Sequence, residues 1–335
     1  MLIPKKKYFL LGYILSVSLI NQAFTSNAKN SAFYVINNNK HIDLIEYIEE
    51  GKQYINTFST QTNAILVLGL SGTGKSTLIN YLVDMPLICI KKDRKWVIDV
   101  DNTTNVEINS LAIGHTSSSK TIYPSSVTPK NKDFSFLDTP GLDDTRGIGY
   151  EIANSVFRKE IAKNVTHLKF LILVTHQDLN NRGHDFRKSL AYFSSLFKSL
   201  ENMSKSIAFI ISRVDNENYS DDEILSMQKE VLIEINEEER TQNKMSSNEY
   251  DVYKQIVVDD RFEIFSNPKK AMRLSSIQKD RIIKLISKLD YVHKSDSAMS
   301  IRISSDYFEQ LHRYSLNNYK KFTAHFDQLL SARNL

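Results

Sequence analysis

The stretch Ala64-Ile-Leu-Val-Leu-Gly69-Leu-Ser-Gly-Thr-Gly-Lys75-Ser76-Thr77 decides the fold of this chain. It begins with a continuous apolar run, which is typical of a parallel strand covered on both faces. Residues Gly69 to Ser76 then match the pattern G-x-x-x-x-G-K-[ST] at every position, and a helical pattern follows from Lys75 to Val83. Strand, motif and helix stand in the order that a phosphate-binding loop requires, so an ordinary glycine-rich turn is the much weaker interpretation.

Each residue type in this loop has a physical task. Glycines let backbone N–H groups turn inward around phosphate oxygens, and the N-terminus of the following helix favours an anion. Lys75 would place its charge on the β- and γ-phosphates, Ser76 would offer its hydroxyl to Mg²⁺, and Thr77 would reach the α-phosphate. The predicted nucleotide-binding residues of the loop are Gly69, Leu70, Ser71, Gly72, Thr73, Gly74, Lys75, Ser76 and Thr77.

A second motif, Asp138-Thr-Pro-Gly141, follows the short apolar run Phe134–Leu137. An acidic residue at the end of such a strand is expected beside the Mg²⁺, usually through a bound water. The backbone N–H of Gly141 could contact a γ-phosphate and so sense its hydrolysis. The pattern D-x-x-G is weak alone, but downstream of a phosphate loop it favours a nucleotide switch over a plain turn.

Together the two motifs resemble the TRAFAC-type GTPases, especially the septin-like and GIMAP (AIG-type) G domains. The run Ile113–Pro124 resembles their first switch, in which a Ser-x-Thr element precedes D-T-P-G. Ser119-Lys-Thr121 is the best match, so Thr121 is the candidate to close on Mg²⁺ and the γ-phosphate, with Thr116 and Thr128 as competitors. The resemblance implies GTP or GDP as the nucleotide and Mg²⁺ as the metal, held by Ser76, Thr121 and Asp138.

The base-recognition element of such GTPases is [NT]-K-x-D at the end of a later strand. Here Ile207–Ile211 is followed by Ser212-Arg-Val-Asp215, with Ser in place of Asn or Thr and Arg in place of Lys. The resemblance implies that the Asp215 carboxylate accepts two N–H bonds from guanine, which adenine does not offer. Arg213 could stack over the base. Thr175-His-Gln-Asp178, one strand earlier, is the rival segment.

Ras-like proteins carry a Gln directly after D-x-x-G to orient water, and this chain has Leu142 there. Septin-like and GIMAP-like domains also lack it, and some complete the site by pairing across the nucleotide face. Candidate helpers are Arg146, which could stabilise charge on the transferring oxygens, His115 and His176. A solvated or salt-bridged loop arginine is the alternative for Arg146. The resemblance thus implies slow hydrolysis, with Thr121 and Arg146 as catalytic residues and a homodimer as one way to complete the site.

Beyond the motifs, apolar strands alternate with amphipathic helices, which predicts a doubly wound, mainly parallel α/β sheet. The expected strands are 64–68, 134–137, 170–174, 207–211 and 262–265, and the expected helices are 41–58, 75–83, 152–165, 185–200, 221–238 and 277–289. Residues 27–39 indicate a linker, 239–250 a loop and 304–332 one long amphipathic helix. The expected organisation is a signal sequence over 1–28, linker and helix over 29–60, a G domain over 61–292 and a C-terminal helical segment over 293–335.

The N-terminus has the pattern of a secretory signal. Lys5–Lys7 are positive, Tyr8–Ile20 form an apolar stretch too short for a usual bilayer span, and Ser26-Asn27-Ala28 is a small-residue cleavage site, with Ala23 a weaker one. We therefore expect secretion or a location in the secretory pathway. An uncleaved membrane anchor over residues 8–20 is the alternative.

Composition excludes several classes of protein. Of the 335 residues 41% are hydrophobic and 24% charged, which fits neither a disordered chain nor a polytopic membrane protein. The formal net charge is +4, and Lys5–Lys7 account for most of it, so no nucleic-acid partner is expected. Cys89 is the only cysteine, which excludes an internal disulfide, and no disulfide-linked partner is expected.

Three functions remain open at this stage. The leading one is a GTP-binding switch or assembly module with slow, Mg²⁺-dependent hydrolysis. An ATPase or P-loop kinase is the second, in which D-T-P-G and Asp215 would be coincidental. The third is a secreted G-domain scaffold without turnover, which the N-terminal segment and Leu142 favour. Comparing GTP with ATP in a titration separates the first two, and phosphate release separates the first from the third.

Overall fold

A computed structural model describes the greater part of the chain. The described residues are 34–37, 40–58, 61–92, 95–101, 111, 113–114, 121–142, 144, 146, 148–180, 183–197, 201–214, 219–242, 247–267, 274, 276–294 and 299. Two compact units are formed, one by Met1–Ile45 with Ile303–Leu335 and one by Glu46–Arg302. The expected signal sequence over 1–28 and the expected helix over 304–332 lie outside the described residues.

The first unit contains a two-stranded antiparallel hairpin. Strand β1 (Tyr34–Asn37) pairs with β2 (Lys40–Asp43), with Tyr34 opposite Asp43. The expectation of a linker over 27–39 is therefore wrong at β1, and the expected helix over 41–58 begins later, as α2 (Leu44–Thr57). The strand is only four residues long, and so short a Tyr-Val-Ile run within polar surroundings carries too little pattern to distinguish it from a linker.

The second unit is built on one large sheet with the strand order β10-β9-β8-β3-β7-β6. Central β3 (Asn63–Gly69) runs parallel to β7 (Phe134–Asp138) on one side and to β8 (His167–Thr175) on the other. Parallel β9 (Ile207–Val214) and β10 (Phe262–Ser266) extend the β8 side. Antiparallel partners are β6 (Ser125–Val127) for β7 and β11 (Val292–His293) for β8. The predicted mainly parallel α/β fold is confirmed.

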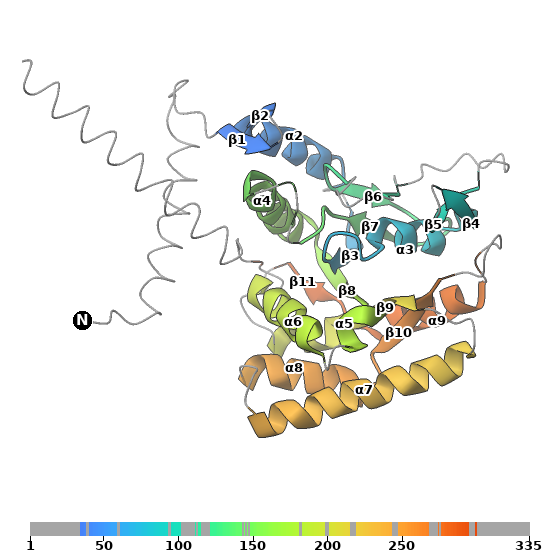
Figure 1. Ribbon diagram of the computed structural model, residues 1–335. Helices are drawn as coiled ribbons and strands as arrows, with labels where there is room; N and C mark the ends of the chain where they lie inside the picture. The colour runs from blue at the N-terminus through green and yellow to red at the C-terminus, as the bar shows by residue number, and fades with distance from the viewer. Residues whose placement is uncertain are drawn as a thin grey trace, which may run out of the picture. The chain divides into compact units, whose positions relative to one another are not determined.

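Helices cover both faces of this sheet, and Figure 1 shows the strands between them. On one face, alternate residues of β3 and β8 pack in a common core with α3 (Lys75–Leu82) and α9 (Ser276–Lys288). The other face is covered by α4 (Ile148–Asn164), α6 (His184–Leu196) and α8 (Ser247–Val258). There Phe186 of α6 lies with its ring centroid 5.6 Å from those of Phe209 and Tyr253. This two-sided burial explains the continuous apolar strands.

The polar stretch expected as a loop over 239–250 is largely helical. Helix α7 (Asp221–Gln242) runs further than expected and α8 begins at Ser247, and the two helices lie together in Figure 1. The polar composition of residues 239–250 led to the wrong prediction of a loop, because one of its charged side chains is buried in an ion pair. Glu239 is only 2% exposed and accepts a hydrogen bond from Arg187 of α6.

Several short elements carried no usable sequence signal. Strands β4 (Leu87–Lys92) and β5 (Lys95–Val100) form a separate hairpin, and α5 (His176–Asn180) follows β8 directly. The compact unit that contains the large sheet spans Glu46–Arg302, so it also includes helix α2 from Glu46 onward. Among the described residues, no helix combines the length and the apolar character needed to cross a bilayer.

Candidate functional site

The phosphate loop and the D-T-P-G motif meet at one edge of the sheet. Parallel β3 and β7 end at Gly69 and Asp138, so the segments that follow them lie side by side. Leu142 N–H donates to the Gly69 carbonyl (3.0 Å), and Ser71 N–H donates to the Leu142 carbonyl (3.1 Å). This close approach of the two backbones requires a glycine at 141, because a Cβ there would lie 2.6 Å from Ser71 Cα.

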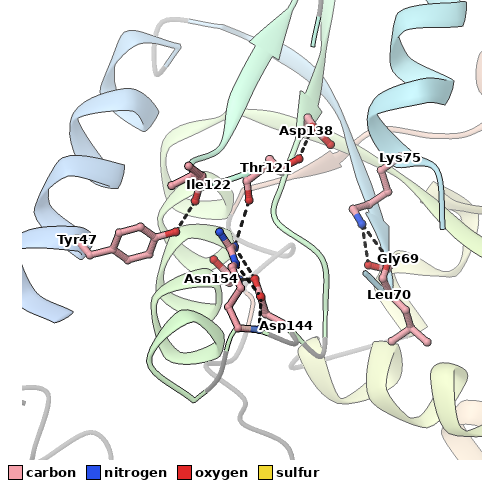
Figure 2. A network of polar contacts seen from close by, with 10 residues as sticks. Tyr47, Gly69, Leu70, Lys75, Thr121, Ile122, Asp138, Asp144 and Asn154 are labelled. Carbon is pink, nitrogen blue, oxygen red and sulfur yellow. Dashed lines mark hydrogen bonds and ion pairs between the residues drawn. The ribbon is translucent and has the colours of Figure 1, made fainter. Parts of the chain in front are cut away.

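The loop itself curls around its lysine. Gly72 and Gly74 have φ angles of +81° and +95°, a left-handed conformation that favours glycine. The Lys75 ammonium donates to the carbonyls of Gly69 (3.1 Å) and Leu70 (3.0 Å), as Figure 2 shows. The next helix, α3, starts at Lys75 and buries Thr77 in its first turn. The predicted phosphate-loop residues thus run from the end of β3 through the turn into the first turn of α3.

Lys75 is a buried charge with a perturbed pKa. Burial lowers the pKa of its ammonium from 10.5 to about 8, and the Asp138 carboxylate opposes that shift. The charged form of a buried cation is disfavoured by desolvation, and a bound anion stabilises that charged form. The loop is therefore electrostatically prepared for a phosphate group.

Three oxygen-bearing side chains from three separate segments converge beside Lys75. Ser76 Oγ donates to Asp138 Oδ2 (2.7 Å), and Thr121 Oγ1 donates to the same oxygen (3.2 Å). The two hydroxyl oxygens are 3.3 Å apart. Of the competing threonines, Thr128 instead lies 2.6 Å from Ser135 Oγ, and Thr116 is outside the described residues. The structure thus brings together the three side chains that the sequence predicted as metal ligands.

These three side chains fit a hard divalent cation. Asp138 is 2% exposed, and its second oxygen, Oδ1, is buried with no hydrogen-bond partner among the described atoms. Burial raises the pKa of this carboxyl, opposed by Lys75, Ser76 and Thr121. A cation would satisfy the orphaned oxygen and stabilise the ionised form, and carboxylate and hydroxyl oxygens suit Mg²⁺. The described residues contain no cluster of three His, Cys, Asp or Glu that could hold a metal instead.

The base-recognition segment is described only in part. Ser212 Oγ donates to the Thr73 carbonyl (2.8 Å), so the Ser that departs from the family pattern ties β9 to the phosphate loop. Arg213 has φ +57° and its guanidinium donates to the Gly72 carbonyl. Asp215 lies outside the described residues. Arg213 therefore contacts the loop, whereas base recognition by Asp215 stays a prediction.

The rival segment has a structural task of its own. The Asp178 carboxylate accepts a hydrogen bond from Thr175 N–H (2.8 Å), and Asp178 N–H donates to Thr175 Oγ1 (3.2 Å). This reciprocal pair is a capping box at the start of α5. The Asp178 carboxylate is thereby used at a helix N-terminus, which argues against a role in base recognition.

Arg146 is salt-bridged in this structure. Its Nε and Nη2 donate to the two carboxylate oxygens of Asp144 (2.9 and 2.6 Å), and Nη2 also donates to the Thr121 carbonyl (3.2 Å). Its guanidinium lies 4.2 Å from the ring centroid of Tyr150. Of the other helpers, His176 is the first residue of α5 and His115 is outside the described residues. The predicted catalytic role of Arg146 stays a prediction.

Sequence reasoning missed two residues next to this site. Asp144 is fully buried and accepts hydrogen bonds from Arg146 and from Asn154 Nδ2 (3.0 Å). Tyr47 of α2 donates through its hydroxyl to the Ile122 carbonyl (2.5 Å), 75 residues away in sequence. Only the two-residue spacing of Asp144 and Arg146 could have indicated their ion pair. No sequence signal indicated the contact of Tyr47 with Ile122.

Comparison with known proteins bears on the nucleotide domain. Residues 64–238 match the family model described as 50S ribosome-binding GTPase. No curated protein matches the chain significantly. The region matched by the family model includes the phosphate loop, the D-T-P-G motif and Ser212-Arg-Val-Asp215.

Solved structures give weaker likenesses. One chain is 16% identical, from a structure described as showing that dimerization is important for the GTPase activity of the chloroplast translocon components atToc33 and psToc159, with 73% of this chain and 87% of that chain covered and a TM-score of 0.39. Toc33 from Arabidopsis thaliana with GDP and Mg²⁺ is 14% identical (77% and 96% covered, TM-score 0.36). The signal recognition particle receptor SRb-GTP/SRX complex from Chaetomium thermophilum is 16% identical (69% and 100% covered, TM-score 0.35). At these scores the family assignment depends on the family model alone.

Proposed function

The chain belongs to the 50S ribosome-binding GTPase family, and from this premise we propose that it binds GTP and GDP with Mg²⁺ and hydrolyses GTP slowly, as a switch or assembly module. The observation that carries the proposal is the convergence of Ser76, Thr121 and Asp138 beside the buried Lys75. The family match supports the reaction class. The narrower resemblance to septin-like and GIMAP-type G domains stays a prediction.

Binding follows from the residues of the loop. Backbone N–H groups from Gly69 to Ser76 surround the phosphates, and Lys75 neutralises the β- and γ-phosphates. Ser76, Thr121 and Asp138 would hold Mg²⁺, which when bound neutralises charge on the β- and γ-phosphate oxygens. Thr121 lies 45 residues from Ser76 in sequence. Its contact with the metal therefore depends on where the Thr121 segment lies relative to the phosphate loop. Gly141 lies against Ser71, within reach of a group held by the loop.

Guanine selectivity is proposed for Asp215, helped by Arg213. Two observations support it: Arg213 is already tied to the Gly72 carbonyl at the loop, and Asp178, the rival, is used as a helix cap. An Asp carboxylate accepts the two donors that guanine presents and adenine lacks. Asp215→Asn should accordingly weaken GTP and improve xanthosine triphosphate, whose base offers an extra carbonyl.

Slow hydrolysis is supported by the environment of Leu142. Its backbone is paired with the phosphate loop and its side chain is only 1% exposed, so no side chain at this position can orient water. A group supplied from outside, by a second copy across the nucleotide face, would then complete the site. The same observation favours the second candidate function, a nucleotide-binding scaffold without turnover. Release of phosphate from GTP under saturation separates the two.

The export of the chain through residues 1–28 is part of this proposal. The supporting observation is the pattern of Lys5–Lys7 followed by apolar Tyr8–Ile20. Removal of residues 1–28 from a C-terminally tagged chain should change its location whether the segment is a cleaved signal or an uncleaved anchor. A cleaved signal should also shorten the tagged full chain, whereas an uncleaved anchor would leave its full length intact.

One titration tests the central claim. GTP, GDP and ATP are titrated into the full chain by calorimetry, with Mg²⁺ and again with the metal removed by a chelator. We expect tight binding of both guanine nucleotides, weaker binding without Mg²⁺, and little binding of ATP. Lys75→Ala should abolish binding because it removes the main cation opposite the phosphates.

The control for this variant is Lys163→Ala, at the end of α4, where the lysine pairs with Glu160 and not with the loop. It should bind as the wild type does. Unchanged GTP affinity in Lys75→Ala would contradict the phosphate-loop assignment, and preference for ATP would favour the ATPase or kinase alternative.

A further inference from the structure

The Thr121–Ile122 backbone is held by two side chains from separate segments, Tyr47 in α2 and Arg146 in the turn before α4. Arg146 Nη2 donates to the Thr121 carbonyl (3.2 Å), and the Tyr47 hydroxyl donates to the next carbonyl, that of Ile122 (2.5 Å). On its other side the same segment presents Thr121 Oγ1 to Asp138 (3.2 Å), as Figure 2 shows. The contacts of Arg146 and Tyr47 therefore place the very hydroxyl that would meet the metal.

The arginine is itself fixed in direction. Its fork binds both oxygens of Asp144, a carboxylate that is fully buried and also accepts from Asn154 Nδ2 (3.0 Å) of α4. Two parallel charge-assisted bonds restrict orientation as well as supplying energy. The ring of Tyr150 lies under the guanidinium at 4.2 Å. Arg146 thus links the Thr121 segment rigidly to the start of α4.

The tyrosine is fixed by an aromatic cluster formed by Tyr47, Tyr54, Tyr123, Tyr150 and Phe157. Its ring centroid lies 5.1 Å from that of Tyr150 and 5.8 Å from that of Phe157, both on α4, and 5.0 Å from that of Tyr123. Helix α2 also contacts α4 closely at Gly51, where a Cβ would lie 2.1 Å from the Phe157 ring.

We propose that Tyr47 and Arg146 are positioning residues, which hold the Thr121–Ile122 segment closed over the metal-binding side chains, so that docking of α2 sets how readily that segment closes. The inference rests on the proposed function. Closure of a Thr on Mg²⁺ and the γ-phosphate is a feature of the triphosphate state, and it is released with the diphosphate. Tyr47 and Arg146 should therefore affect the affinity for GTP and not the affinity for GDP.

Tyr47→Phe tests the proposal with the smallest change, because it keeps the ring in the cluster and removes only the donor. Affinities for a non-hydrolysable GTP analogue and for GDP are measured on the full chain with Mg²⁺. We expect the analogue to bind about fivefold more weakly, as for loss of one hydrogen bond, with GDP unchanged. Tyr54→Phe is the matched control on α2, since Tyr54 stacks on Tyr123 and its hydroxyl makes no hydrogen bond within the described residues.

Arg146→Lys supplies the second arm and distinguishes positioning from a direct catalytic role. Arg146→Ala would remove the cation that pairs with the buried Asp144 carboxylate, so the lysine variant is the one that preserves folding. As a positioning residue, Arg146→Lys weakens the analogue and spares GDP, as Tyr47→Phe does. If Arg146 acts on the transferring oxygens instead, turnover falls with analogue affinity unchanged, which overturns this part of the proposal.

The remaining outcomes are also decisive. Equal losses for the analogue and GDP, or no loss for either, overturn the coupling between α2 and the Thr121 segment while leaving the proposed function intact. If the wild-type chain binds neither nucleotide, the proposed function fails and this inference falls with it.

Discussion

At the scale of single residues, Lys75 shows how burial prepares a site for its ligand. The ammonium donates to the carbonyls of Gly69 and Leu70, which partly replace the lost water. They do not replace it fully, because burial still lowers the pKa from 10.5 to about 8. The charged form is the one that binds phosphate, and bound phosphate should raise the pKa again.

This pKa gives a pH dependence whose sign is defined. Above about pH 8 the free protein has lost the proton that the complex must hold, so binding takes up a proton and affinity falls as pH rises, by at most about tenfold per pH unit. Below that pH the lysine is already charged, so its contribution to nucleotide affinity does not change with pH. Calorimetry of GDP binding between about pH 7 and 8.5, in two buffers with different ionisation heats, measures the uptake directly. Equal apparent heats in both buffers at the upper pH would contradict the assignment.

At the scale of elements, α5 begins directly after β8, and two side chains form the cap at this junction. Thr175 and Asp178 exchange two hydrogen bonds across the first turn of α5. These bonds satisfy backbone N–H groups that a helix start leaves without partners. The carboxylate is therefore a cap, and a nearby nucleotide-binding edge does not by itself make it a ligand.

Asp178→Ala should cost about 1 kcal/mol of unfolding free energy, through loss of the cap, and leave the preference for GTP over ATP unchanged. Chemical denaturation measures the first quantity and calorimetric titration the second. Thr175→Ala is the companion variant, because it removes the other half of the same box and should have the same two effects. A fall in guanine preference in either variant would return Asp178 to the list of base-recognition candidates.

At the scale of the whole nucleotide domain, the described residues bring the predicted phosphate-binding and metal-binding side chains together but not the predicted hydrolytic ones. Ser76, Thr121 and Asp138 come from segments 45 and 62 residues apart and meet in one place. By contrast Leu142 is buried, and Arg146 is committed to Asp144 and to the Thr121 carbonyl. Of the positions considered for hydrolysis, Leu142 thus offers no polar group and Arg146 is engaged elsewhere.

The isolated chain should therefore hydrolyse GTP slowly, at roughly 10⁻⁴–10⁻² s⁻¹, as GTPases without a supplied arginine do. If a second copy completes the site across the nucleotide face, activity per molecule should rise with protein concentration under saturating GTP. The measurement is phosphate release over about a hundredfold range of concentration, beside the oligomeric state at each point. Constant activity per molecule would show that hydrolysis is not driven by pairing.

The fold and the loop followed from local pattern. Buried strands of a parallel sheet are continuously apolar, and a phosphate loop needs its glycines, lysine and serine in one order, so β3, Gly69–Ser76 and the alternating strands were recognisable from the chain alone. The polar residues from 239 onward predicted a loop, but α7 continues through Glu239 to Gln242. The reason is a buried ion pair of Glu239 that no single-sequence pattern reveals.

The sequence by itself determined that this chain is a mainly parallel α/β protein with a phosphate loop, because strand burial and loop geometry are imposed by neighbouring residues. Only the tertiary structure decided which threonine stands beside Ser76 and Asp138, that Asp178 caps a helix, and that Arg146 and Tyr47 hold the Thr121 segment. Except for the local cap at Asp178, those contacts join residues that are separated by 17 to 75 positions in sequence. Ser76 and Asp138 meet because parallel β3 and β7 bring their carboxyl ends to one edge, whereas Tyr47 reaches Ile122 from α2. A sequence pattern cannot say which distant side chains the packing brings together there.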